Sequence, residues 1–97
     1  MYRVELRVTT RQWFVDGQEI SFNENMRRAI YQMPVETRVT VRLSCYFVGK
    51  NKDDAFEQAH AYCRSDYYNR KFQEWSRNRN TGIDATIERV SKGIAGR

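Results

Sequence analysis

The segment from Ser65 to Asn80 carries the residue types that hold anions and stack on bases. Between positions 64 and 79, five basic residues oppose two acidic ones, a local excess of +3: Arg64, Arg70, Lys71, Arg77 and Arg79 against Asp66 and Glu74. Four aromatic residues are interleaved with them: Tyr67, Tyr68, Phe72 and Trp75. Guanidinium groups hold phosphates and aromatic rings stack on unpaired bases, so the mixture is suited to single strands or to RNA.

The same segment also has a purely structural interpretation. Phe72 and Trp75, three positions apart, are typical of the buried stripe of a helix, and a basic run is typical of its solvated face. The chain has no helix-turn-helix, zinc-finger or RNA-recognition signature. The site hypothesis names eight residues as contacts to nucleic acid or to a protein partner: Arg64, Tyr68, Arg70, Lys71, Phe72, Trp75, Arg77 and Arg79.

Metal and catalytic chemistry have less support in the sequence. Glu57, His60 and Cys63 recur at every third position, yet structural zinc sites use paired CxxC or HxxxH arms, which this chain lacks. His60 and Cys63 could imitate a base and a nucleophile, but a thiol on a packed helix face is usually inert. The chain has one histidine, no glycine-rich phosphate loop and no GxSxG motif. We therefore expect a non-enzymatic protein with no catalytic residue, no metal and no cofactor.

Size and composition indicate one folded domain over residues 1–97. The chain has 97 residues, of which 40% are hydrophobic, enough for one modest core. No apolar run is long enough to span a bilayer, and the N-terminal MYRVELRV alternates instead of forming the apolar block of a signal peptide. These features predict a cytoplasmic protein that does not contact a membrane. Cys45 and Cys63 are then expected to be reduced, small, buried residues, with a disulfide as the less favoured alternative.

The net charge of +5 favours an anionic partner, because thirteen of the seventeen basic residues are arginine. Arginine forms planar bidentate contacts with phosphate and carboxylate groups. The partner would be nucleic acid, a nucleoprotein complex or an acidic protein. The alternative is that the charge only keeps a small domain in solution.

Alternating patterns predict a sheet of three or four strands. Residues 2–9 place Val4, Leu6 and Val8 on one face, and Asp16-Gly17 is typical of a two-residue hairpin turn that pairs Trp13 with Ile20. The inward positions change from even to odd between these two segments, so we expect a bulge or break near residues 9–11. Residues 37–48 form the longest alternating run, with inward Val39, Val41, Leu43, Cys45 and Phe47, and are predicted to be central; residues 82–90 form the last strand.

Two helical regions follow from apolar spacing and caps. Ser21 and Glu24 form a capping box that opens a helix over residues 22–33, which Pro34 ends. A second helical region begins at residues 53–54 and carries two apolar stripes, separated by about 120° around a straight helix: Phe56, Ala59 and Cys63, and then Tyr68, Phe72 and Trp75. Either the helix bends near Ser65, which can cap a new segment, or the second stripe faces a partner.

These elements predict a two-layer α+β domain. Three or four mainly antiparallel strands form the sheet, two or three helices pack on one of its faces, and residues 91–97 form a flexible tail. The other face of the sheet is a second, weaker basic patch, formed by Arg3, Arg7, Arg38, Arg42 and Tyr46. Asp84 and Glu88 on the last strand are expected to pair with the strand arginines and to reduce its charge.

The function expected from the sequence is nucleic-acid binding through the basic, aromatic C-terminal helix. The alternative is a protein-interaction module in which Tyr68, Phe72 and Trp75 form an exposed anchor patch, or a homodimer surface. The small size, the α+β plan and the lack of a catalytic motif are similar in kind to small phage and mobile-element proteins. Some of those proteins inhibit host complexes, as anti-CRISPR proteins do.

Overall fold

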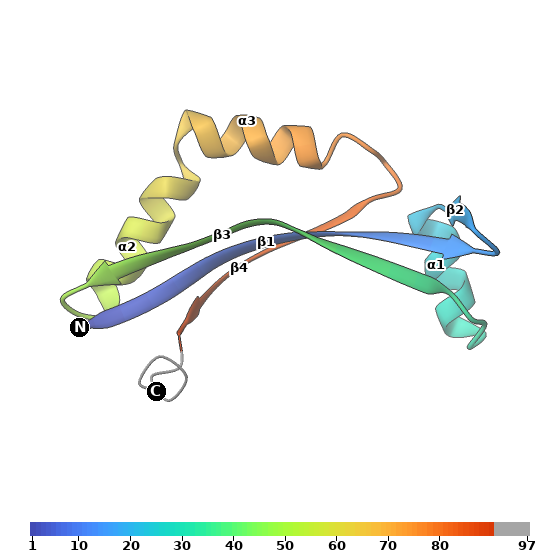
Figure 1. Cartoon of the computed structure of the whole chain (residues 1–97), viewed down its shortest axis with the longest axis horizontal. Coiled ribbons are helices and arrows are strands. Elements are labelled where there is room, and N and C mark those ends of the chain that lie inside the picture. The colour runs from blue at the N-terminus through green and yellow to red at the C-terminus, as the bar shows by residue number, and fades with distance from the viewer. Residues whose placement is uncertain (91–97) are drawn as a thin grey trace.

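Residues 1–90 fold as an open four-stranded antiparallel sheet with three helices (Figure 1), an α+β architecture. The structure is a computed structural model that describes residues 1–90, so the predicted tail at 91–97 lies outside the described residues. The elements in chain order are β1 (Tyr2–Val15), β2 (Gln18–Ile20), α1 (Phe22–Ile30), β3 (Glu36–Gly49), α2 (Lys52–Cys63), α3 (Asp66–Trp75) and β4 (Gly82–Arg89). No helix within residues 1–90 is long and apolar enough to cross a membrane.

The central strand is β1, and the prediction that residues 37–48 would be central was wrong. One edge of β1 pairs with β3 along nearly its whole length. The other edge pairs with β4 over residues 4–11 and with β2 over residues 13–15. The strand predicted at 2–9 extends through to Val15, and it takes partners on both edges. The side chains of Val4, Leu6 and Val8 are fully buried as a result.

A β-bulge lies halfway along the β1–β3 pair. Val8 is opposite Leu43, but Thr9 is opposite Val41, so Arg42 is an extra residue in β3. The irregularity expected near residues 9–11 is therefore present, but the inserted residue belongs to the partner strand. β1 itself keeps a continuous register with β4 from Val4 to Arg11.

The bulge reverses the faces of the first half of β3. Val39 and Val41, predicted to point inward, lie on the face away from α2 and α3 and are 55% and 48% exposed. Arg42, predicted to point outward, lies on the helix-covered side, where its Nε donates a hydrogen bond to Thr10 Oγ1 at 3.0 Å. One inserted residue shifts the period-two alternation by one position, which accounts for both differences.

The second helical region bends, which confirms one of the two predicted alternatives. α2 ends at Cys63 and α3 begins after Ser65, whose Oγ accepts a hydrogen bond from the Tyr68 amide at 3.2 Å. The two helices lie at an angle over the same face of the sheet (Figure 1). Ala55 and Ala59 of α2 belong to a cluster around Val4. Three aromatic residues of α3 join a second cluster around Leu6 and Val8: Tyr68, Phe72 and Trp75.

α1 lies apart from α2 and α3, at the far end of the β1–β3 ribbon (Figure 1). The predicted capping box is confirmed on one side, because Ser21 Oγ accepts a hydrogen bond from the Glu24 amide at 3.0 Å. The helix ends at Ile30, earlier than the predicted residue 33. The Asp16-Gly17 turn is also confirmed, with φ of 50° and 80° and Trp13 opposite Ile20. α1 has no buried residue, and Phe22 contacts the sheet through the Trp13 ring at 5.7 Å between centroids.

Candidate functional site

The aromatic stripe of α3 is part of the interior. Tyr68 is only 6% exposed, and Phe72 and Trp75 are partly buried in the cluster around Leu6 and Val8. The Tyr68 and Phe72 rings lie 5.8 Å apart between centroids, at a tilt typical of core aromatic pairs. In this arrangement the faces of Tyr68 and Phe72 pack against protein, which argues against their use as a stacking platform or an exposed anchor patch.

Burial also controls the titration of the groups around Tyr68. Removal from water raises the pKa of Tyr68 to about 12, with the neighbouring Cys63 as a smaller cause. Burial likewise raises the pKa of the Cys63 thiol and of the Cys45 thiol. Both cysteines are free and half-buried. At neutral pH these thiols therefore stay protonated, which is the less nucleophilic form.

The five predicted basic residues fall into two groups. Arg64 forms an ion pair with Glu57 at 3.1 Å, and Lys71 Nζ lies 3.9 Å from a Glu74 carboxylate oxygen. The other three form no ion pair with a carboxylate of residues 1–90: Arg70, Arg77 and Arg79. All three are exposed, so their charges face solvent, Arg70 at the middle of α3 and the other two beyond its end.

A cleft lies where α3 ends, and we call it the α3-end cleft. It has a volume of about 350 Å³ and is lined by Gln12, Arg42, Glu74, Trp75, Arg77, Asn78 and Thr81. The bulge brings Arg42 to the helix-covered side, and the chain leaving α3 brings Arg77 to the same cleft. Arg42, like Arg77, has no ion pair with a described carboxylate. The sequence predicted that Arg42 lies on the opposite face, because the alternation of apolar and polar residues in β3 gives no sign of a bulge.

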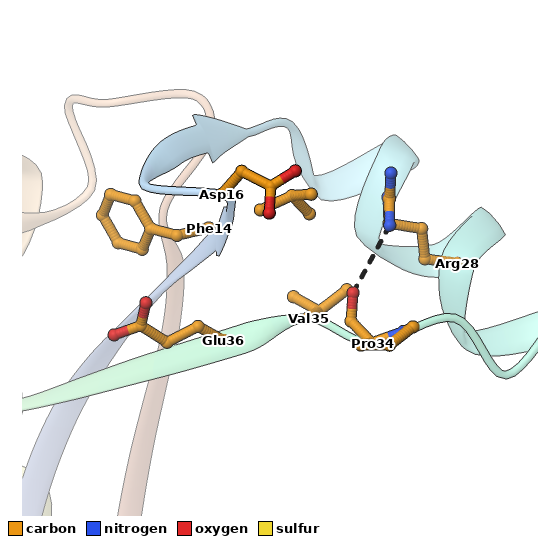
Figure 2. A pocket seen from close by; sticks show the side chains of 7 residues that line it. Phe14, Asp16, Arg28, Pro34, Val35 and Glu36 are labelled. Carbon is orange, nitrogen blue, oxygen red and sulfur yellow. Dashed lines mark hydrogen bonds between the residues drawn. The ribbon is translucent and has the colours of Figure 1, made fainter.

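A larger hollow lies near the β1–β2 turn, as Figure 2 shows. Its volume is about 550 Å³, and its lining residues are Phe14, Val15, Asp16, Arg28, Pro34, Val35 and Glu36. The charged groups here are the acidic Asp16 and two residues that already have partners, Arg28 and Glu36. Arg28 pairs with Glu24 at 3.0 Å and donates a hydrogen bond to the Pro34 carbonyl at 3.4 Å, and Glu36 accepts one from Arg38 Nε at 2.8 Å. The hollow therefore offers less unpaired charge to an anion than the α3-end cleft does.

The second basic patch, on the face of the sheet away from α2 and α3, is largely neutralised. Arg11 forms an ion pair with Asp84, and Arg7 lies 3.8 Å from Glu5. Cross-strand pairing with Asp84 was expected, although for a different arginine. Arg3 lies over the Tyr46 ring, 5.6 Å from its centroid. Arg38 and Arg42, assigned to this patch from the sequence, lie on the other face beyond the bulge.

α1 presents an apolar stripe to solvent. Phe22, Met26 and Ile30 of the helix are 47%, 50% and 73% exposed, and Tyr31 and Met33, which follow the end of the helix, are 67% and 39% exposed. The spacing predicted a helix whose stripe faces the core, and the helix is present without the burial. The helix lies beyond the part of the sheet that α2 and α3 cover (Figure 1), so its apolar side is left largely exposed by residues 1–90, apart from the contact of Phe22 with Trp13.

Comparison of the chain with protein-family models, with curated proteins and with solved structures finds no match. Within residues 1–90, no three His, Cys, Asp or Glu side chains lie close enough together to hold a metal ion. His60 is exposed, with its ring 6.4 Å from that of Phe56 on the same helix. The strongest candidate site is therefore the α3-end cleft and the unpaired arginines around it.

Proposed function

We propose that this protein binds the phosphate backbone of nucleic acid at the α3-end cleft. The observation that carries the proposal is the meeting of Arg42 and Arg77, from segments far apart in the chain, in one cleft without an acidic partner for either. Arg70 on α3 and Arg79 in the following loop add unpaired charge nearby in the sequence. Guanidinium groups bind phosphate oxygens through charge-assisted hydrogen bonds.

The chemistry of the cleft favours backbone contacts over base recognition. The Arg42 Nε is bound to Thr10, which holds the side chain and leaves its terminal nitrogens for an anion. Glu74 also lines the cleft, but it lies near Lys71, so part of its charge is offset. Because Tyr68 and Phe72 are packed in the core, the stacking that distinguishes bases is supplied at most by the partly exposed Trp75.

Replacement of Arg77 by alanine is expected to weaken nucleic-acid binding about tenfold or more, the effect of one charge-assisted hydrogen bond. Binding would be measured by fluorescence anisotropy with labelled single-stranded RNA, single-stranded DNA and duplex DNA of equal length. The slope of log affinity against log salt for the single strands should fall by about 0.7, because one fewer counterion is released. All three probes should show the loss, because each presents phosphates.

Arg27→Ala is the matched control. Arg27 is also exposed on a helix, but it lies in α1 and forms an ion pair with Glu24 at 2.7 Å. The variant removes the same net charge and should leave affinity and salt slope close to those of the parent. Equal losses for Arg27→Ala and Arg77→Ala would show that net charge alone attracts the probe, and salt-independent binding would refute the proposal.

We infer a second candidate function from α1, a contact with an apolar groove of another protein. An amphipathic helix with an uncovered stripe is the usual form of a helix-in-groove contact. If the protein inhibits a host nucleoprotein complex, as anti-CRISPR proteins do, the apolar stripe of α1 would contact a protein of that complex. The stripe of α1 now supports this alternative better than the packed rings of α3 do.

A photo-reactive residue in place of Met26 tests this second candidate, because Met26 is 50% exposed at the middle of the stripe. We expect it to cross-link one protein, and the purified protein should bind the parent chain but bind Ile30→Lys at least tenfold more weakly. A photo-reactive residue at Asn23 serves as the control position, because it is exposed on the same helix outside the stripe. Equal cross-linking from both positions, or equal binding by Ile30→Lys, would contradict a contact through the stripe.

A further inference from the structure

The side chains of the first half of β3 are exposed to solvent on both faces of the strand. All seven residues from Glu36 to Arg42 are exposed, whereas the second half of the strand alternates between exposed and partly buried positions. Its outer edge pairs with no strand of residues 1–90, since β3 pairs with β1 alone. Four of the seven are the β-branched residues that favour strands: Thr37, Val39, Thr40 and Val41. Such an edge is a template for another strand.

We propose that this edge pairs with the same edge of a second copy of the chain. The two strands run antiparallel about a two-fold axis that passes between Val39 and the partner's Val39. The regular stretch begins with β3 at Glu36 and ends at the bulge at Arg42, and Val39 is its midpoint. A two-fold axis at the midpoint is the arrangement that pairs the whole stretch with itself.

The charges along the stretch favour this register over an axis at either neighbouring residue. With the axis at Val39, Glu36, which also pairs with Arg38 of its own chain at 2.8 Å, lies opposite the partner's Arg42, and this pair occurs twice by symmetry. Arg38 lies opposite the partner's Thr40. An axis at Arg38 would put that arginine against the partner's Arg38, and an axis at Thr40 would put Arg38 against the partner's Arg42. Like charges directly opposite each other destabilise a strand pair, and opposite charges stabilise it.

The apolar side chains agree with this register. Val39 and Val41 lie on the face away from α2 and α3. In the proposed pair Val39 meets the partner's Val39, and Val41 meets the partner's Thr37, so four half-exposed valines form one patch at the centre. The axis is perpendicular to the sheet, so α2 and α3 of both copies lie on the same side. The assembly is closed at two copies, because the β3 edge of each copy is occupied by the β3 edge of the other.

This dimer does not depend on nucleic-acid binding at the α3-end cleft. Arg42 is shared by the two proposals, because its terminal nitrogens would face the partner's Glu36 as well as the cleft. Arg42 then contributes less charge to the cleft in the dimer than in a single copy, whereas Arg77 lies outside the paired stretch. For this reason the dimer is tested by molecular mass and by cross-linking, in samples free of nucleic acid.

The variant Val39→Cys tests the position of the axis, because it places two thiols directly across it. Under mild oxidation we expect a covalent dimer to form at least tenfold faster than with Arg38→Cys, whose thiol would face the partner's Thr40 on the other side of the sheet. The unaltered chain controls for Cys45 and Cys63, which are half-buried. Equal rates for the two variants would overturn the register, and sedimentation of the unaltered chain as a monomer at all concentrations would overturn the dimer.

Charge exchange tests the register independently. Glu36→Arg and Arg42→Glu should each weaken dimerisation at least tenfold, because each places like charges opposite one another. The double variant restores opposite charges at the same two places, so we expect its dimer to recover to within about threefold of the parent. Circular dichroism of each variant confirms that the fold is retained. A double variant as weak as the single variants would refute the pairing of Glu36 with Arg42.

Discussion

Leu6→Ala is expected to lower the free energy of unfolding by about 3 to 4 kcal/mol, one of the two largest effects predicted for this protein. Leu6 is fully buried on the central strand, and its side chain packs in the cluster of Val8 and Tyr68 that joins α3 to the sheet. Truncation removes apolar contact and leaves a cavity that a strand paired on both edges cannot close by moving. Urea unfolding followed by circular dichroism gives the measurement.

Ile30→Ala is the matched control for this prediction. Ile30 is also a large aliphatic residue, but it lies on α1 and is 73% exposed, so its truncation should change the free energy of unfolding by less than about 0.5 kcal/mol. A cost for Ile30→Ala as large as that for Leu6→Ala would mean that the α1 stripe is covered in solution. The contrast therefore tests whether the stripe is free for a partner, on which the second candidate function depends.

Gly49→Ala is expected to cost about 3 kcal/mol or more, through a clash that the chain cannot relieve locally. Gly49 is the buried last residue of β3, and a Cβ atom there would lie 2.9 Å from the Ala55 Cα and closer still to the Ala55 amide nitrogen. These atoms belong to the backbone of α2, so the helix would have to move away from the sheet. The loss would be measured by chemical unfolding, and nuclear magnetic resonance would show shifts in the first turn of α2.

Gly17→Ala provides the comparison, because this glycine has a different requirement. Gly17 has φ of 80° in the hairpin turn, and a Cβ atom there would meet no atom within 4 Å. The substitution should cost only about 1 kcal/mol, the price of a left-handed conformation for a residue with a side chain. If both variants lost the same stability, the close approach of α2 to the end of β3 would be contradicted.

Features that depend on nearby residues were read correctly from the sequence. The Asp16-Gly17 turn needs two residues that tolerate positive φ, and the Ser21 and Ser65 caps need a side-chain oxygen three residues before an unpaired amide. The bend at Ser65 was one of two predicted alternatives. It was predictable because two stripes about 120° apart cannot both reach one sheet from a straight helix.

The candidate site was predicted only in part. The basic residues Arg70, Arg77 and Arg79 were named from their local density, and they are exposed and unpaired within the described chain. Arg42 was assigned to the wrong face, and the exposure of the α1 stripe was not anticipated. Both errors concern where an element lies relative to a distant one, and a local pattern contains no information on that position.

The sequence alone determined the element types, their caps and turns, and the excess of arginine, because these follow from interactions within a few residues. The tertiary structure alone decided that β1 is central, that Arg42 is an inserted residue, and that Tyr68 is core. These three outcomes depend on pairing between segments dozens of residues apart, where a shift of one position exchanges the two faces of a strand. That shift moved Arg42 toward α3 and left Val39 and Val41 exposed, so it created both the proposed anion site and the proposed dimer edge.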